Sequence, residues 1–217
     1  MTTPPPSDRA RLRRAAHKAA YDRATIDAIL DAQPLALVAA VLDGAPVVIP
    51  TLQWRHGDHV YFHGSSASRT LRAAAGNPVC LTVSILEGWK LARSAFHHSL
   101  NFRSVMVHGR AERVPAEEKA AALEDMIESL FPGRWQTLRP MNEKELKATA
   151  VLRLPLSEAS AKVATGPVQD EEEDYDLPIW AGVVPVREVA GEVEADVRNL
   201  PDVAMPDHVI PKYLRRR

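Results

Sequence analysis

Cysteine and long apolar runs are both scarce in this sequence. Cys80 is the single cysteine among 217 residues, so the chain forms no internal disulfide, and we expect a buried, unreactive thiol in a reducing compartment. The longest apolar stretches, residues 35–42 and 79–86, have the length of strands and fall well short of the roughly 20 residues that a membrane-spanning helix needs. A disulfide-stabilised secreted domain is therefore excluded, and no membrane partner is expected.

An excess of either charge is also missing. The formal net charge is −1, which gives no electrostatic reason to expect a nucleic acid as the partner. The first residues combine prolines with a basic run from Arg9 to Lys18 and lack the apolar segment of a secretory signal. We therefore expect a cytoplasmic protein whose basic and acidic runs are mostly solvated.

The common catalytic signatures are absent as well. No GxGxxG, GxxxxGK[ST], GxSxG or HExxH motif occurs, and no side chain stands out as an obligatory acid or base, so the catalytic residues remain unassigned. Eight histidines are present, but the adjacent His97 and His98 point to opposite faces of an expected strand, so no metal site is predicted. His63 and His108 lie at strand ends, where ligation of a haem remains open.

Hydrophobic periodicity and turn residues predict strands that alternate with short helices. Residues 25–32 predict a helix behind a Thr25 cap, and Asp43-Gly44 predicts a hairpin turn. A second hairpin is predicted at Glu87-Gly88, and Gly109 is a candidate bulge. The other expected elements are strands at 35–42, 47–51, 60–63, 79–86, 89–96, 101–114 and 150–156, and helices at 65–75, after Pro115 and at 142–148.

This order predicts a mainly antiparallel β-barrel with flanking helices. Residues 1–20 form a basic tail, residues 21–166 the barrel domain, and residues 167–217 an acidic, proline-bearing extension. The extension contains one apolar island, WAGVVPV, which we expect to pack on the barrel or on a dimer partner.

Two segments carry candidate chemistry. In YFHGSSASRT, residues 61–70, a strand leads through serines into a helix, and Ser65, Ser68 and Arg69 suit either a bound phosphate or simple helix capping. In the strand around Asn101 and Arg103, these two side chains share one face. They suit either the carbonyls and N1 region of a flavin or the solvated side of a sheet.

Taken together, the segments resemble a known protein family. The series GAPVVIPTL, YFHGSSASRTL and NPVCLTVSILEGWKLARSAFHHSLNFRSVMVHGRAERV, followed by EEKAAALEDMIESLFPGRW, ASAKVATGP and WAGVVPV, is similar to the nitroimidazole-resistance, flavin-nucleotide-binding branch of the pyridoxamine 5'-phosphate oxidase-like proteins. The resemblance covers roughly residues 21–187. Phe102 stands where a tyrosine is frequent in that branch.

The resemblance implies an FMN-binding split β-barrel that forms a homodimer with FMN at the interface. By this resemblance Ser65, Ser68 and Arg69 hold the phosphate, with His63 beside them. Residues that border the flavin or its ribityl chain are Pro50, Thr51, Asn101, Arg103 and Ser104, and residues that complete the site are Lys162 and Trp180. Haem and deazaflavin are less expected cofactors.

The function expected from this resemblance is electron transfer. FMN accepts a hydride from reduced nicotinamide and passes electrons to a small acceptor such as a nitroaromatic or a quinone. The alternative is a protein of the same fold that binds FMN, haem or deazaflavin without turnover, because fold alone does not determine reaction.

Overall fold

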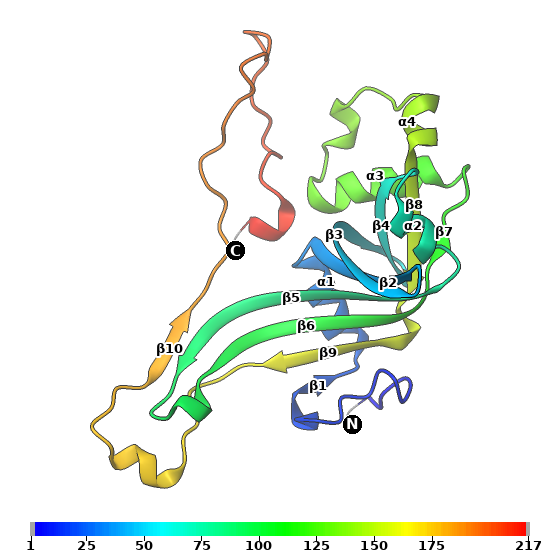
Figure 1. Cartoon of the computed structure of the whole chain (residues 1–217). Coiled ribbons are helices and arrows are strands. Elements are labelled where there is room, and N and C mark those ends of the chain that lie inside the picture. Colours follow the sequence, from blue (N-terminus) through cyan, green and yellow to red (C-terminus); the bar gives the residue numbers. More distant parts are fainter. Residues whose placement is uncertain (1–2, 216–217) are drawn as a thin grey trace.

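The computed structural model describes residues 3–215 as a mainly antiparallel sheet with helices at its sides (Figure 1). The strands are β1 (Ala19–Ala20), β2 (Leu35–Leu42), β3 (Ala45–His56), β4 (His59–Ser65), β5 (Pro78–Leu91), β6 (Ser99–Arg110), β7 (Glu112–Arg113), β8 (Thr149–Pro155), β9 (Ala159–Ala164) and β10 (Gly182–Pro185). The α-helices are α1 (Arg23–Asp31), α2 (Arg69–Ala74), α3 (Lys119–Leu130) and α4 (Glu143–Ala148). Neighbouring strands follow the order β1-β9-β6-β5-β2-β3-β4-β8-β7, and β10 pairs with β5, so the sheet does not close on itself. This is the predicted split arrangement.

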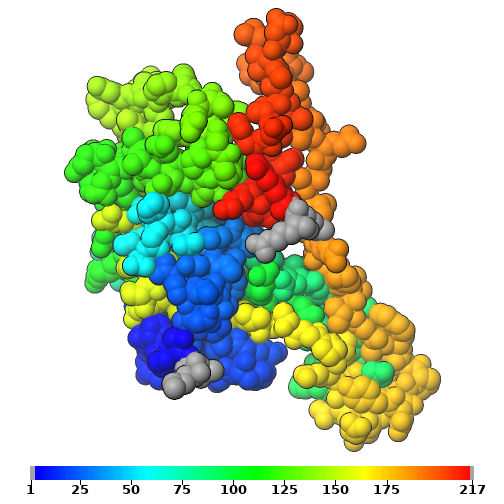
Figure 2. Space-filling view, turned by 180° about the vertical axis from the view of Figure 1, so that it is seen from behind, coloured from blue at the N-terminus to red at the C-terminus, as the bar shows by residue number. Residues whose placement is uncertain are grey.

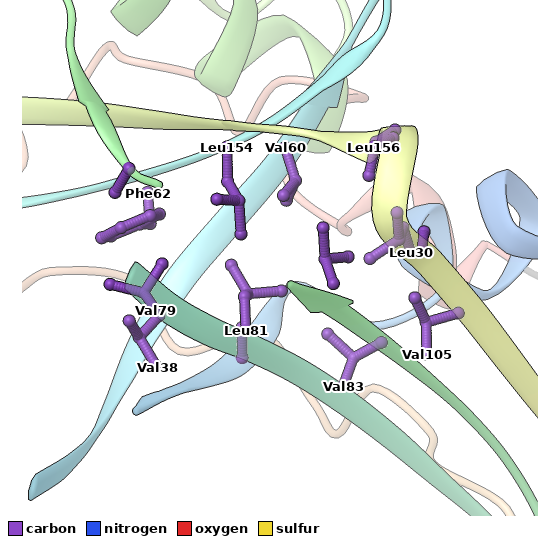
Figure 3. Packing of buried hydrophobic residues seen from close by; sticks show 14 of the residues in the cluster. Leu30, Val38, Val60, Phe62, Val79, Leu81, Val83, Val105, Leu154 and Leu156 are labelled. Atoms are coloured by element: carbon purple, nitrogen blue, oxygen red, sulfur yellow. The ribbon is translucent and has the colours of Figure 1, made fainter. Parts of the chain in front are cut away.

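The main core lies between the two halves of this curved sheet. Apolar side chains of β2, β5 and β6 meet those of β4 and β8, among them Val38, Leu81, Val105, Phe62 and Leu154, which are all fully buried (Figure 3). Strict alternation of buried and exposed positions along β2 aims every second side chain inward. A second, smaller core forms where α3 covers Trp54 and Val151.

Most of the predicted elements are present, with shifted boundaries. The hairpin at Asp43-Gly44 is confirmed, since both residues adopt the positive φ that a tight two-residue turn requires, 52° and 79°. Helix α1 begins two residues earlier than expected, and its cap is Asp22, whose carboxylate accepts the Thr25 N–H. The expected Thr25 cap is therefore wrong.

The hairpin predicted at Glu87-Gly88 is also wrong. Strand β5 continues through these residues to Leu91 with a register shift between Leu86 and Gly88, and the chain turns only at the 3₁₀ turn η2 (Ala95–His97). His97 and His98 are thus in a turn, not in a strand. A glycine is needed here because β10 passes so closely that a Cβ at Gly88 would lie 3.0 Å from the Val184 carbonyl oxygen.

Gly109 does not mark a bulge either. It pairs regularly with Val79 across β5 and β6. A Cβ there would lie 2.9 Å from Leu154 Cδ1, so the missing side chain lets β8 pack onto β6.

The far halves of β5 and β6 leave the barrel as a projecting ribbon, which we define as residues 87–101 together with β10 (Figure 1). Its tip is fixed to the acidic segment η5 (Glu172–Asp176) and its neighbours. The Arg93 guanidinium hydrogen bonds to the fully buried Asp170 carboxylate at 3.0 Å and lies 4.8 Å above the Tyr175 ring. After β10 the chain runs through an exposed stretch and returns to the body at the turn η6 (Lys212–Leu214), shown in red (Figure 2). In residues 3–215 no helix is long and apolar enough to span a bilayer.

Candidate functional site

The turn from β4 into α2 holds three of the predicted site residues. The Ser65 hydroxyl accepts the Ala67 N–H at 3.1 Å, and the Ser68 hydroxyl caps α2 by accepting the Leu71 N–H at 3.3 Å. Each hydroxyl therefore keeps its proton for donation to another group. Arg69 donates to Asp43 at 2.6 Å, but both side chains are exposed, so water screens the pair and the guanidinium remains accessible to an anion.

His63, Thr51 and Pro50 lie next to this turn on β4 and β3. The Thr51 hydroxyl donates to the His63 carbonyl oxygen at 3.0 Å, and Pro50 is exposed. His63 Nδ1 is buried and has no hydrogen-bond partner among residues 3–215. Burial lowers the pKa of His63 below its usual value, so the ring is neutral at pH 7. The indole of Trp54 meets this ring edge-on at 5.9 Å.

Asn101 and Arg103 form a second group on the ribbon side of β6. As predicted they share one face of the strand, the face that carries Val105 into the core. Arg103 Nε donates to Glu87 Oε1 at 2.7 Å, and Asn101 Nδ2 donates to the Gly166 carbonyl oxygen at 3.0 Å. The Asn101 Oδ1 atom is buried without a partner in the described part of the chain, which leaves it open to a donor.

Ser104 and Lys162 occupy the opposite face of the same sheet. They are directly opposite each other in the register of β6 and β9, and the Lys162 ammonium lies 5.7 Å from the centre of the Phe102 ring. Trp180 precedes β10 and is 70% exposed, with its ring folded over Gly182. The segment WAGVVPV therefore lies along β5 of the ribbon.

The two groups do not meet within one chain. Strands β5 and β2 separate β6 from β3, which sets the groups about 14 Å apart across the sheet at the usual spacing of ~4.8 Å per strand. Leu37 of β2 pairs with Pro50 of β3 on one side and with Thr82 of β5 on the other, and Thr82 pairs with Met106 of β6. Met106 is therefore level with Pro50 across the sheet, and Asn101 lies five residues away from Met106 along β6. One chain thus holds the β4–α2 turn and the polar residues Asn101 and Arg103 of β6 at separate places.

The outer sheet face is the side of the sheet that carries Ser104 and Lys162, opposite to the side of Asn101 and Arg103. We define it by six exposed apolar side chains that the register places on one side of the sheet: Leu35, Leu37, Val41, Val48, Leu86 and Met106. Exposed apolar patches of this kind are typical of surfaces that another protein or a ligand covers. Cys80 lies half-buried on the same face opposite His108, and burial raises the pKa of its thiol.

Sequence reasoning missed Glu87 and Trp54. The pair Glu87-Gly88 predicts a turn, whereas Glu87 lies in β5 and forms an ion pair with Arg103 of the neighbouring strand β6. Trp54 is stacked on Tyr61 at 5.5 Å and is 2% exposed. The alternation Pro50, Leu52, Trp54 along β3 was the available signal.

Known proteins are similar to this chain in sequence and in structure. The pyridoxamine 5'-phosphate oxidase family model matches residues 22–163. A flavocytochrome from Azotobacter vinelandii is 50% identical over 94% of this chain and 96% of that chain, with a TM-score of 0.92. An FAD- and haem-binding protein from Mycobacterium smegmatis is 36% identical over 88% of this chain and 95% of that chain, with a TM-score of 0.85.

A more distant structure shares the fold. It is described as a 5-nitroimidazole antibiotic resistance protein from Bacteroides thetaiotaomicron and is 23% identical over 67% of this chain and 86% of that chain, with a TM-score of 0.56. No curated protein matches the chain. The family model and the two similar structures together show that the chain belongs to the pyridoxamine 5'-phosphate oxidase family.

Proposed function

We propose that this protein binds a flavin and a haem and transfers electrons between them and a small acceptor. The observation that carries this proposal is the similarity, at 50% and 36% identity over nearly the whole chain, to a flavocytochrome and to an FAD- and haem-binding protein. Flavin binding agrees with the expectation from sequence. Haem, which the sequence left as a lesser alternative, becomes part of the proposal.

The turn from β4 into α2 that holds Ser65, Ser68 and Arg69, which we call the phosphate turn, fits the anionic end of a flavin nucleotide. Arg69 offers a guanidinium whose present partner, Asp43, is exposed and easily exchanged. Ser65 and Ser68 each accept a backbone N–H, and among residues 3–215 no backbone group accepts their hydroxyl protons. The three residues together supply charge and hydrogen bonds on one side of the turn, which is what a phosphate requires.

His63 is the residue that best fits a haem iron. Only a neutral imidazole ligates a metal, and burial keeps His63 neutral. Its buried Nδ1 has no partner among the described residues, so the ring is not committed to a structural hydrogen bond. His108 is the alternative ligand, since burial followed by the charge of Arg9 also lowers its pKa.

A second copy of the chain would complete the site. The phosphate turn and the β6 residues Asn101 and Arg103 are separated in one chain, and the outer sheet face on the other side of β6 is apolar and exposed. A two-fold dimer that buries this face would set the ribbon of one protomer near the phosphate turn of its partner. We therefore propose a homodimer with a shared cofactor site.

The chemistry belongs to the cofactors: a bound flavin exchanges two electrons and a haem one. This chain's own residues bind and orient. Arg103, held by Glu87, and Asn101, with its free carbonyl oxygen, present a fixed donor and acceptor on one sheet face. We propose that reduced nicotinamide is the donor and that a nitroaromatic or quinone is the acceptor, as the family resemblance implies.

The absorption spectrum of the purified protein tests the cofactor assignment. We expect flavin bands together with a Soret band, and mass spectrometry of the released flavin distinguishes FMN, implied by the resemblance, from FAD, named for the 36% identical relative. His63→Ala should lose the Soret band and keep the flavin, whereas the control His98→Ala keeps both. A colourless protein that takes up neither cofactor on reconstitution would overturn the proposal.

Turnover is tested with the same preparation. Oxidation of reduced nicotinamide in the presence of a nitroaromatic or quinone indicates an enzyme. Cofactors that remain oxidised under these conditions indicate a carrier or a protein with another donor.

A further inference from the structure

The chain between β10 and η6 leaves the body as a long loop, which we call the C-terminal arm and define as residues 189–207. All of residues 187–205 are exposed, and the hydrogen bonds of the arm join arm residues to one another, as in the bond from the Asn199 N–H to the Asp196 carbonyl oxygen at 3.0 Å. The base of the arm is closed, because Tyr213 Oη donates to Glu188 Oε1 at 3.4 Å. The arm therefore projects from the body with its side chains in solvent (Figure 1).

The arm carries apolar side chains along its whole length. Val197 is 98% exposed, Leu200 72% and Met205 66%, and Val189, Val193 and Val203 are exposed as well. An extended segment that buries no apolar surface has nothing to offset the conformational entropy lost when it is ordered. Groups of exposed apolar side chains are typical of surfaces that another protein covers. The arm thus has the composition of a segment that packs on a second surface.

The charge of the arm indicates what that surface is. The arm has five carboxylates and one guanidinium, a formal charge of −4, whereas the whole chain carries only −1. Positive charge is concentrated in the basic tail, whose cations are Arg9, Arg11, Arg13, Arg14 and Lys18. Arg11 and Arg13 share the single carboxylate of Asp8, at 3.2 and 3.5 Å, and Arg14 and Lys18 form no ion pair among residues 3–215. The basic tail is therefore only partly neutralised by its own chain.

The basic tail is also held in place on the body. Ala10 is 2% exposed, and the Leu12 N–H donates to Tyr21 Oη at 2.9 Å. Burial, and after it the charge of Lys18, lower the pKa of Lys90 below its usual value, so positive charge continues from the tail onto β5. An ordered cationic surface of this kind is complementary to an acidic segment.

The arm and the basic tail lie at opposite ends of the molecule, so they cannot meet within one chain (Figure 1, Figure 2). A two-fold dimer can bring them together, because each copy then offers the same surfaces to the other. A two-fold axis along the long dimension of the molecule would set the two acidic arms side by side, where they repel each other. An axis across that dimension sets each arm against the tail of the other copy, where unlike charges meet.

We propose that the C-terminal arm of each copy lies on the basic tail of the other copy in the homodimer. This inference rests on the homodimer of the proposed function and adds a second contact, away from the outer sheet face. Arm carboxylates pair with cations of the tail. The apolar side chains of the arm are covered by the aliphatic stems of the tail's arginines and lysine.

Charge reversal on each side, followed by analytical ultracentrifugation, tests the contact. Glu192→Lys together with Glu194→Lys reverses charge on the arm, and Arg13→Glu together with Arg14→Glu reverses it on the tail. Each pair of changes should weaken self-association about tenfold, because like charges then face each other. All four changes together should restore the parental affinity, since the ion pairs form again with opposite signs.

A matched control separates direct contact from an effect of net charge. Lys144→Glu together with Lys147→Glu makes the same change of net charge on exposed lysines of α4. Added to the arm variant, these changes should leave self-association weak. Parental affinity in both the arm and the tail variant, or no recovery when the two are combined, overturns the proposal.

A photo-reactive side chain on the arm identifies what the arm touches. Benzoylphenylalanine in place of Val197 should give a covalent dimer on irradiation, with the arm joined to residues 3–20 of the other copy. Mixing of isotopically light and heavy protein shows that the link joins two copies. A link within one chain, or to another part of the second copy, overturns the arm contact and leaves the homodimer standing. A parent protein that is monomeric in light scattering overturns both, and no outcome changes the flavin and haem assignment.

Discussion

At the scale of single residues, burial decides the charge state of His63. The folded protein binds a proton on this ring less readily than the unfolded chain does, because burial lowers the pKa of His63 from its ordinary 6.5. The same burial that keeps the ring neutral, as the proposed ligation of haem requires, therefore makes folding sensitive to mild acid.

The sign of this effect gives the first prediction. Well above pH 6.5 His63 is unprotonated in both the folded and the unfolded protein, so its contribution to stability is fully present. As the pH falls below 6.5, the unfolded protein takes up the proton first, so the free energy of unfolding falls. Urea denaturation of the cofactor-free protein should show that the free energy of unfolding falls more between pH 7.5 and 5.5 in the parent than in His63→Phe. His17→Gln, an exposed control, should keep the parental difference. Equal pH dependence in His63→Phe and the parent contradicts this assignment.

Arg69 carries the second prediction at this scale. Arg69→Ala should weaken flavin binding by about 1.5–3 kcal/mol, the range of a charge-assisted hydrogen bond. Stability should change by less than about 1 kcal/mol, because its pair with Asp43 is exposed. Fluorescence titration of the cofactor-free protein measures the affinity, and the exposed Arg110→Ala is the control. An unchanged affinity would place the phosphate elsewhere.

At the scale of elements, the ribbon is held by very few contacts at its tip. Asp170 accepts hydrogen bonds from the Arg93 backbone and side chain, both at 3.0 Å, and its own side chain is fully buried. Burial alone would raise the pKa of Asp170, but the hydrogen bonds from Arg93 outweigh it and hold the pKa below its usual value.

Asp170→Asn should therefore loosen the tip without unfolding the barrel. The charge pair is lost while the side-chain volume is kept, so we expect the free energy of local opening to fall and the amide hydrogens of the tip to exchange faster. Hydrogen exchange of residues 92–98 and 170–176 measures this opening. Glu172→Gln, an exposed carboxylate of η5, is the control. Equal protection of the tip in Asp170→Asn and the parent would show that other contacts hold it.

Elements with clear local signals could be predicted from sequence, and those defined by distant partners could not. Strand β2 and the Asp43-Gly44 turn follow from alternation and turn chemistry within ten residues. Strand β9, with the small residues Ala159, Ser160 and Ala161, has weak alternation and forms because β6 and β1 pair with it. The sequence Glu87-Gly88 fits a turn and a β-bulge equally well. Which of the two forms depends on pairing with β10, which lies almost a hundred residues further along the chain.

In the candidate site, too, local features could be predicted from the sequence and tertiary contacts could not. That Asn101 and Arg103 share a face followed from strand geometry, whereas their ion-pair and amide partners, Glu87 and Gly166, depend on tertiary structure. The unpaired Nδ1 of His63 reflects its surroundings in the second core and carries no sequence signal.

At the scale of the whole molecule, the outer sheet face is the surface on which the proposed homodimer depends. Leu37 at its centre is 44% exposed, although apolar neighbours surround it. Burying this face between two copies fits the interfaces of roughly 2,000 Å² or more that stable homodimers form.

Leu37→Glu should convert the dimer into a folded monomer. A carboxylate at the centre of an apolar interface loses its hydration without gaining a partner, so association becomes unfavourable. Light scattering at micromolar concentration measures the mass, and circular dichroism confirms that the fold is kept. Leu138→Glu, which places the same charge on a surface remote from this face, should remain dimeric. A parent protein that is already monomeric would refute the shared-site proposal.

The strand order also determines when the protein can fold during synthesis. The first strand, Ala19–Ala20, pairs with Ala161 and Lys162, and β6 finds its second neighbour only in β9. Contacts between such distant parts of the chain close slowly, and they cannot form until Ala164 has left the ribosome. Until then β6 is an open sheet edge that offers unpaired N–H and C=O groups to other nascent chains. Ribosome-bound chains in which β9 is still inside the exit tunnel should therefore depend on chaperones, whereas chains long enough for residues 159–164 to have emerged should not.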